Sequence, residues 1–326
     1  MSHSPFAPLL PLHGLSVCLR FTEPSEFNFF HQMTVDAFCR FMLNSPEDYK
    51  NSLTTEAPES GRLNYQIGDE YRFSVMSYAG KKHHFQPLIN RLLGLPQSAP
   101  VTDKAAPIRN NCQCSRLIDL VDGKAVVNAQ GLNAFTSRNL IDLARAWQKE
   151  DTLYPRIITL QWLSPTRLMR SSDDRKDFNL TGEDRFCRDK THLNAALLVK
   201  RIIESLNNLI TEMGQSPVVI DQQVYQSLPL SVSHADLFWL DTPYYSKDKQ
   251  DNTAGGMVGY ITMTQTAPIP YGIWQGLILG QYLGVGQRRT SGFGKYQLKL
   301  DLGNERRIQA PLRSQRAQTL IAHALT

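Results

Sequence analysis

The chain has 326 residues, of which 41% are hydrophobic and 20% are charged, and its formal net charge is +5. This length suits two domains of roughly 150 residues each, and the composition is that of a globular protein, which argues against a disordered chain. No stretch approaches the ~18 apolar residues of a membrane span, and the N-terminus lacks the basic start of a signal peptide. Five cysteines without metal-ligand spacing predict reduced thiols in the cytoplasm and no metal or cofactor.

Hydrophobic periodicity predicts alternating strands and helices in the first half of the chain. In chain order the predicted elements are a strand at 15–22, a helix at 29–43, a polar loop at 51–70, a strand at 71–78, a helix at 85–93, a proline-bearing linker at 96–107, a hairpin at 117–128 around Asp122-Gly123, and a helix at 137–148. We expect a domain boundary at 151–155, so that the first domain spans residues 1–152.

The second half predicts a strand at 156–163, a highly charged irregular loop at 166–188, a long helix at 191–213, strands at 218–220, 236–240 and 257–264, a helix at 271–283 and a strand at 295–301. With one extra short strand, this order approximates the β–α–β–β–α–β pattern of a ferredoxin-like unit, and the first half is a looser version of it. The predicted fold is therefore α+β, with two tandem ferredoxin-like (RRM-like) domains. The second domain spans 153–302, and a basic tail or linker follows at 303–326.

A glycine-rich basic loop lies between the last predicted helix and the last strand, at 279–296. Its two Gly-x-Gly steps, at 284–286 and 292–294, bracket the pair Arg288 and Arg289. Glycine lets a ligand approach the main chain, turn amides bind anions, and arginine matches phosphate. Dinucleotide and P-loop motifs run strand–loop–helix, whereas this loop runs helix–loop–strand, so the pattern favours a polymeric anion. A long β-turn with exposed arginines is the alternative.

The positive charge of the chain is concentrated near its C-terminus. Residues 281–326 contain eight lysines and arginines against one aspartate and one glutamate, a net +6, so the other 280 residues together carry −1. A localised basic zone is typical of nucleic-acid binding, although a solvated tail would have the same composition.

Three segments resemble the RAMP superfamily of CRISPR proteins, and most closely its Cas-six type endoribonucleases, which cut precursor CRISPR RNA within its repeats. They read LQWLSPTRL at 160–168, LFWLDTPYYS at 237–246 followed by GGMVG at 255–259, and the glycine-rich loop at 279–296. Residues 1–150 resemble the family only in the order of their elements. The resemblance implies metal-independent cleavage, in which a ribose 2′-OH attacks the adjacent phosphate and leaves 2′,3′-cyclic phosphate and 5′-OH ends.

That reaction needs a base for the 2′-OH, an acid for the leaving 5′-oxygen and cations around the phosphate, and histidine suits both proton transfers. His31 lies near where the family commonly places a catalytic histidine or tyrosine, and its helical position could face a cleft. His84, before the helix at 85–93, is the second catalytic candidate. A structural role for His31, and a tyrosine–lysine–arginine arrangement in its place, stay open. The expected RNA-binding residues are Gly284, Gly286, Arg288, Arg289, Gly292, Gly294, Lys295, Arg167, Arg170 and Lys247.

The leading hypothesis is a metal-independent endoribonuclease that makes CRISPR guide RNAs. Its alternatives are a non-catalytic RAMP subunit that holds guide RNA in an effector complex, and an enzyme that uses the loop for a small nucleotide. The expected partners are CRISPR repeat RNA and either other CRISPR effector subunits or a fused reverse transcriptase–integrase, with no membrane.

Overall fold

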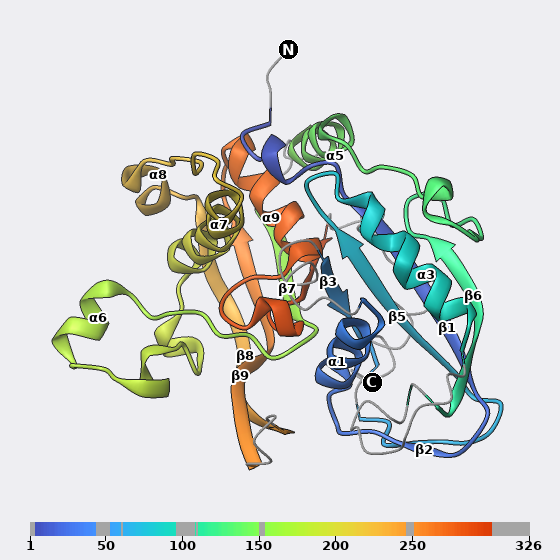
Figure 1. The fold of residues 1–326 in the computed structure, drawn as a ribbon. Coiled ribbons are helices and arrows are strands. Elements are labelled where there is room, and N and C mark those ends of the chain that lie inside the picture. Colours follow the sequence, from blue (N-terminus) through green and yellow to red (C-terminus); the bar gives the residue numbers. More distant parts are fainter. Residues whose placement is uncertain are drawn as a thin grey trace. The chain divides into compact units, whose positions relative to one another are not determined.

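The computed structural model describes residues 4–43, 53–59, 61–95, 108, 110–149, 154–245 and 251–301. This part of the chain has an α+β fold with two antiparallel four-stranded sheets, each in its own compact unit (Figure 1). Of the described residues, unit 1 contains Thr136–Arg289, residues 293–301 and the N-terminal residues up to Leu9, whereas unit 2 contains Leu10–Phe135 and Thr290–Gly292. Within the described ranges, no helix has both the length and the apolar character needed to cross a membrane.

The sheet of unit 2 has the strand order β3-β5-β1-β6, and all its neighbouring strands are antiparallel. The strands are β1 (His13–Phe21), β3 (Leu53–Glu56), β5 (Glu70–Ser77) and β6 (Cys112–Asp119). Helices α1 (Gln32–Leu43) and α3 (Phe85–Leu93) bury one face each against this unit's hydrophobic core. A two-stranded sheet of β2 (Ser25–Glu26) and β4 (Asn64–Tyr65) adds Tyr65 to the same core.

The sheet of unit 1 has the strand order β10-β7-β9-β8 and is also antiparallel. Its strands are β7 (Arg156–Trp162), β8 (Leu230–Tyr245), β9 (Asp251–Gln265) and β10 (Tyr296–Asp301). The β8–β9 hairpin extends past the ends of the helices (Figure 1). These helices are α5 (Ser137–Lys149), α6 (Ser172–Asp177), α7 (Ala195–Glu212), α8 (Gln222–Gln226) and α9 (Tyr271–Leu283).

Helix α9 is central to unit 1, because every residue from Ile273 to Leu283 is buried. The ring of Trp274 packs edge-on against Trp147 of α5, with the centroids 5.4 Å apart, and the Tyr271 hydroxyl donates to the Ile141 carbonyl at 2.7 Å. Helix α5 therefore belongs to unit 1, although it precedes the domain boundary that we expected at residue 153.

The strongest sequence patterns are confirmed. The helices predicted at 85–93 and 271–283 have those bounds in the structure, and strands β1, β5, β7 and β10 lie within one or two residues of their predicted positions. The strands predicted at 236–240 and 257–264 lie inside the longer strands β8 and β9, the first at the centre of β8 and the second in the C-terminal half of β9.

Three local predictions were wrong, and a fourth was confirmed only in part. The polar loop at 51–70 contains β3, whose partner is β5 and whose sequence Leu-Thr-Thr-Glu is too short and polar to indicate a buried strand. The hairpin predicted around Asp122-Gly123 does form, in a shorter version: Ile118 and Ala125 form an antiparallel bridge, and the amides of Asp119 and Val126 donate to the carbonyls of Lys124 and Leu117. Residues 218–220 form no strand, because Val218 bonds to the Asn207 side chain of α7. The loop at 166–188 includes α6, which the Ser171 hydroxyl caps by accepting from the Asp174 amide at 3.0 Å.

Candidate nucleic-acid interface

The short segment Pro165–Arg167 connects β9 and the glycine-rich loop within unit 1. Thr166 exchanges two backbone hydrogen bonds with Met257 of β9, at 2.8 and 2.9 Å. On the other side, the Arg167 carbonyl accepts from the Gln287 amide and the Pro165 carbonyl accepts from the Gly294 amide, both at 3.0 Å. The three segments singled out in the sequence, which are far apart along the chain, therefore meet at one place.

This convergence depends on glycines that leave no room for a side chain. A Cβ on Gly256 would lie 2.7 Å from the Cβ of Pro165 and 2.8 Å from the amide nitrogen of Thr166. On Gly286, which has a φ of +79°, it would lie 2.4 Å from the Arg167 carbonyl oxygen. Since real Cβ atoms do not approach so closely, larger residues would separate the segments.

The glycine-rich loop has a left-handed backbone at five positions, which are Gly284, Gly286, Arg288, Gly292 and Gly294. Arg288 adopts this conformation, with φ +57°, despite its side chain, which is a source of strain common at functional sites. The amides at 284–287 and 293–295 all donate to groups of the protein itself, among them the Ser205 hydroxyl, which accepts from the Gly286 amide at 2.8 Å. The glycine steps thus hold the shape of the loop.

Two of the loop's three cations are buried. The side chain of Lys295 is 1% exposed and donates from Nζ to the Tyr282 carbonyl at the end of α9. Arg289 is 8% exposed, and its guanidinium lies 3.8 Å from the Glu212 carboxylate of α7. Both cations therefore fix the loop to helices, whereas Arg288 is only half-buried.

The predicted cations outside the loop have protein partners too. Arg167 is 6% exposed, pairs with Glu183 at 2.8 Å, and places its guanidinium carbon 4.4 Å from the centroid of the Phe186 ring. Arg170 is half-buried and pairs with Asp174 at 3.5 Å. Lys247 lies outside the described residues.

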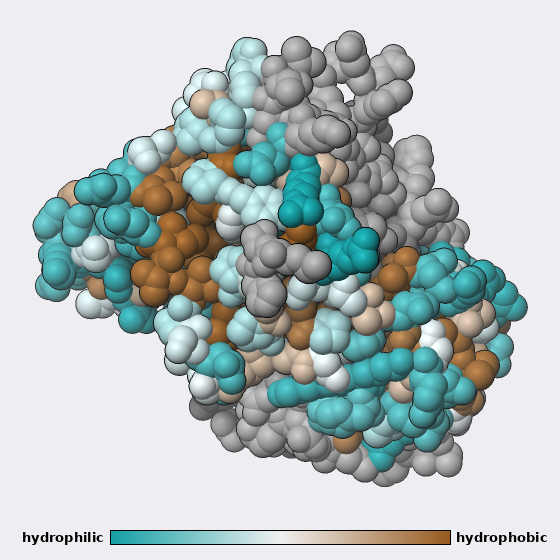
Figure 2. All heavy atoms as spheres, turned by 90° about the horizontal axis from the view of Figure 1, so that it is seen from above, coloured by the Kyte–Doolittle hydropathy of each residue, from teal (hydrophilic) through white to brown (hydrophobic). Residues whose placement is uncertain are grey.

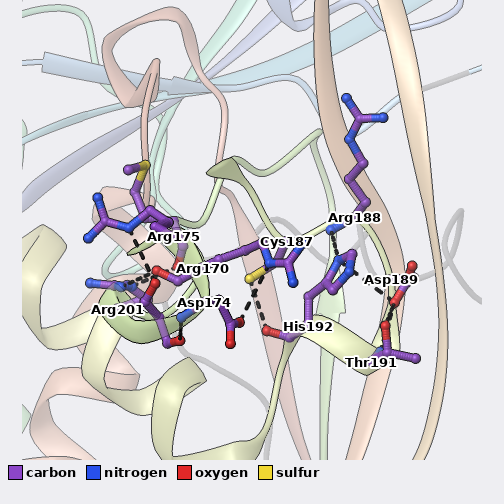
Figure 3. A network of polar contacts seen from close by, with 11 residues as sticks. Arg170, Asp174, Arg175, Cys187, Arg188, Asp189, Thr191, His192 and Arg201 are labelled. Atoms are coloured by element: carbon purple, nitrogen blue, oxygen red, sulfur yellow. Dashed lines mark hydrogen bonds and ion pairs between the residues drawn. The ribbon is translucent and has the colours of Figure 1, made fainter. Parts of the chain in front are cut away.

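A network of polar contacts anchors the charged segment 169–192 to α7 (Figure 3). Arg201 of α7 donates to the carbonyls of Met169 and Arg170, at 2.8 and 2.6 Å. Further along, the Arg188 amide donates to His192 Nδ1 at 3.2 Å, and the Cys187 thiol donates to the His192 carbonyl at 3.3 Å. Burial raises the pKa of Cys187 to about 12, which keeps the thiol protonated. The side chain of Arg188 extends away from the other labelled residues (Figure 3).

The end of that segment stacks on the β8–β9 hairpin, an arrangement that the sequence analysis missed. The rings of Phe186 and Trp239 are stacked with an interplanar angle of 25°, and the Arg188 guanidinium lies 5.0 Å from the Trp239 ring centroid. The available signals were the arginine-rich composition of 166–188 and the tryptophan of the family-like segment at 237–246.

A separate cavity of about 630 Å³ opens between the start of α7 and the first half of β8. Its wall includes Lys190, Tyr225 and His234, and the His234 Nε2 lies 3.1 Å from the Tyr260 hydroxyl. Hydrophobic side chains also gather on the side of the molecule where α7 and α8 lie (Figure 2). None of the predicted site residues lines this cavity.

His31 is buried in an aromatic cluster of unit 2, so the expectation that its ring faces a cleft is not met. The side chain is 0% exposed, and its ring centroid lies 4.7 Å from that of Phe27 and 5.5 Å from that of Tyr71. The ring nitrogen Nε2 is 2.9 Å from the Arg62 carbonyl oxygen. Burial lowers the pKa of His31 to about 4, so its imidazole is neutral at pH 7.

His84 has a more accessible position, in a cation-rich loop at the start of α3. The loop leaves β5 through two left-handed residues, Ala79 and Gly80, and continues as Lys-Lys-His-His. His84 is half-buried, and its ring centroid lies 4.0 Å from that of the exposed His83. Of the two predicted histidines, His84 is therefore the one whose surroundings admit a ligand.

Residues 160–296 match the family model of the CRISPR-associated endoribonuclease Cas6. The chain is also 35% identical, over 96% of its length and with a TM-score of 0.75, to a chain of a solved partial Cas6-RT-Cas1–Cas2 complex. Residues 160–296 thus carry a Cas6 family region. The chain covers 50% of the relative in the partial complex. It covers 31% of a chain in a Cas6-RT-Cas1–Cas2 complex, with the same identity and TM-score. The chain therefore spans half or less of the length of these relatives.

A Cas6 product complex shares the fold, with 16% identity, 89% of this chain and 99% of that chain covered, and a TM-score of 0.50. No curated protein sequence matches the chain. The range matched by the Cas6 model contains all three converging segments, and it includes neither His31 nor His84.

Proposed function

We propose that this chain cleaves CRISPR precursor RNA within its repeats by metal-independent chemistry. The observation that carries the proposal is the convergence of Pro165–Arg167, β9 and the glycine-rich loop, because the range matched by the Cas6 model contains these segments. The connectivities β1–α1–β3–β5–α3–β6 and β7–α7–β8–β9–α9–β10, with equivalent strand orders, support two tandem ferredoxin-like domains. Residues 1–152 and 153–302 would correspond to these domains, with α5 packed in unit 1, and 303–326 would form a basic tail.

The RNA backbone would meet the glycine-rich loop at its arginine-bearing part. Since the amides at 284–287 and 293–295 donate within the protein, an incoming phosphate would be held by Arg288 and the residues next to it. Lys295, Arg289, Arg167 and Arg170 would act by fixing this surface and by adding positive potential.

The proposed reaction moves the phosphoryl group from the 5′-oxygen to the ribose 2′-oxygen, without a bound cofactor. A base removes the proton of a ribose 2′-OH, its oxygen bonds to the adjacent phosphorus, and the bond from phosphorus to the 5′-oxygen breaks. An acid returns a proton to that oxygen, so the products carry a 2′,3′-cyclic phosphate and a 5′-OH. A histidine can perform either transfer, because both of its protonation states are populated near pH 7.

We assign the proton transfer to His84 in preference to His31. His84 is half-buried beside Lys81 and Lys82, cations that would attract the phosphate of the substrate. His31 could act only after its ring leaves the aromatic cluster that encloses it.

The test is cleavage of labelled repeat RNA in EDTA by the wild-type protein and by His84→Ala, His83→Ala and His31→Ala. We expect His84→Ala to lose about 100-fold or more in rate, the lower range for one general acid or base. The neighbouring His83→Ala is the matched control and should keep most activity. Equal activity in all variants would contradict the assignment, whereas tight binding without cleavage by the wild type would favour a non-catalytic RNA-holding subunit.

The similarity to Cas6-RT-Cas1–Cas2 complexes supports a partner as well as an activity. We propose that the chain works together with a reverse transcriptase–integrase of the RT-Cas1 type and with Cas2, in addition to repeat RNA. Co-purification with these proteins, tested with and without ribonuclease treatment, would separate protein contacts from contacts through RNA.

A further inference from the structure

We propose that Arg188 and Trp239 form a stacking site for one unpaired base of the RNA, on the outer surface of the β8–β9 hairpin. The inference rests on the proposed function, since it names a part of the same substrate. The charged segment 166–188 would then contact a base of the RNA, a role that neither the glycine-rich loop nor the histidines provide.

The site is a layered arrangement of flat groups. Trp239 lies across the hairpin, because a Cβ on Gly255 would be 2.2 Å from its indole nitrogen, and this nitrogen donates to Asp241 Oδ1 at 3.0 Å. Arg188 covers the indole with its guanidinium 5.0 Å from the ring centroid, and Phe186 stacks beside it.

Arg188 is held in place but keeps an accessible outer surface. Its amide is bonded to His192, and its guanidinium lies 3.3 Å from the Asp184 carboxylate, while its side chain remains 40% exposed. A guanidinium plane of this kind, supported from below by an indole, is a platform on which nucleic-acid bases stack. A base would add one more layer to the existing stack.

The local charge favours a base over a phosphate. The arginines around Phe186 and Trp239, which are Arg167, Arg185 and Arg188, are matched in number by the carboxylates of Glu183, Asp184 and Asp241. Since the positive charge is offset at short range, the site offers flat surface without a strong anion-binding field. Bases within a duplex already stack on both neighbours, so the ligand would be a nucleotide of a single-stranded part of the RNA.

Trp239 provides a direct readout of binding. The other three of the four tryptophans are 0%, 5% and 0% exposed (Trp147, Trp162 and Trp274), whereas Trp239 is half-buried. Acrylamide quenching of the fluorescence therefore reports mainly on Trp239. The probe is a short single-stranded 2′-O-methyl oligoadenylate, which cannot be cleaved by 2′-OH attack, compared with the same strand in a duplex with oligouridylate.

We expect the single strand to protect Trp239 from acrylamide and the duplex to protect it much less. Arg188→Lys keeps the charge and removes the flat surface, so it should weaken single-strand binding by about 5-fold or more, and Trp239→Ala by about 5- to 150-fold, the worth of one stacked base expressed as a ratio. Trp239→Phe should retain most of the affinity.

The control is Arg138→Ala, which removes an arginine with a 91% exposed side chain on α5, and should leave the affinity within about 2-fold of the wild type at fixed salt. The stacking site would be overturned if Arg188→Lys binds the single strand as tightly as the wild type does, or if the single strand and the duplex protect Trp239 equally. Either result would hold even if repeat RNA is still cleaved. Protection by the single strand without any cleavage of repeat RNA would instead support the stacking site and contradict the proposed nuclease.

Discussion

Burial separates the roles of two cations in the glycine-rich loop, Lys295 and Arg288. The ammonium of Lys295 is enclosed and bonded to the Tyr282 carbonyl, so its loss would leave a cavity and an unsatisfied buried acceptor. We predict that Lys295→Ala lowers the free energy of unfolding by about 1–3 kcal/mol, measured by urea denaturation. Arg288→Ala should leave that free energy within about 0.5 kcal/mol and weaken RNA binding several-fold. The reverse pattern would show that Lys295 is the phosphate contact.

The buried imidazole of His31 predicts a specific pH dependence of stability. Its pKa is about 4 in the folded protein and 6.5 in the unfolded chain, so the unfolded chain binds the proton first as the pH falls. The folded state is therefore stabilised above pH 6.5, and about 2–3 kcal/mol is lost between pH 6.5 and pH 4.

The matched variant is His31→Gln, whose amide can still donate to the Arg62 carbonyl but does not titrate. Unfolding at pH 6.5 and pH 4 should show a smaller loss in the variant than in the wild type, by about that amount. Identical losses would mean that His31 is accessible to protons in the folded state, which would restore it as a candidate for catalysis.

At the scale of single residues, the sequence indicated which segments form the candidate site, but it often predicted the wrong role for a residue within them. The spacing of glycines and arginines predicts a ligand loop, but it does not show that Lys295 and Arg289 are enclosed by α7 and α9. Likewise, a helical position beside apolar residues does not show which neighbours enclose the ring of His31. Burial of a polar side chain depends on tertiary contacts, which local periodicity does not contain.

Among the elements, helix α9 and its partner α5 carry a prediction of their own. Trp147 of α5 is fully buried against Trp274, and the Arg156 guanidinium donates to the Trp147 carbonyl at 3.0 Å. We predict that Trp147→Ala lowers the free energy of unfolding by about 3–5 kcal/mol, as large cavities in protein cores do. Arg138→Ala on the exposed face of the same helix should change it by less than about 0.5 kcal/mol. A small effect of Trp147→Ala would place α5 outside the core of unit 1.

Elements were predictable where one pattern dominated. Helices α3 and α9 have clear ends, since Gly94 closes the first and Gly284, with φ +77°, closes the second. The hairpin of β8 and β9 was underestimated, because Gly255, Gly256 and Gly259 indicate a strand entry when they stand in a sequence. In the structure they lie inside β9. Gly255 and Gly256 make room for Trp239 and Pro165, and Gly259, with φ +109°, allows the close approach of the Asp236 carbonyl.

At the scale of the whole molecule, the proposed RNA processing depends on the side chains of the protein itself. Four of the eight cations in the basic C-terminal zone, from Arg288 to Lys299, lie within the described residues, and those beyond residue 301 lie outside them. The order of elements was predictable from hydrophobic periodicity, and the family from three short segments. The pairing of α5 with α9 and the Arg188–Trp239 stack were not, because both depend on contacts between distant segments.

The most direct test of the central claim is the end chemistry of the product from repeat RNA incubated with the wild-type protein in EDTA. We predict one main cut within the repeat, with a 2′,3′-cyclic phosphate on the upstream fragment and a 5′-OH on the downstream fragment, identified by mass spectrometry. Cleavage that stops in EDTA, or that yields a 3′-OH and a 5′-phosphate, would contradict attack by the ribose 2′-OH and with it the proposed mechanism.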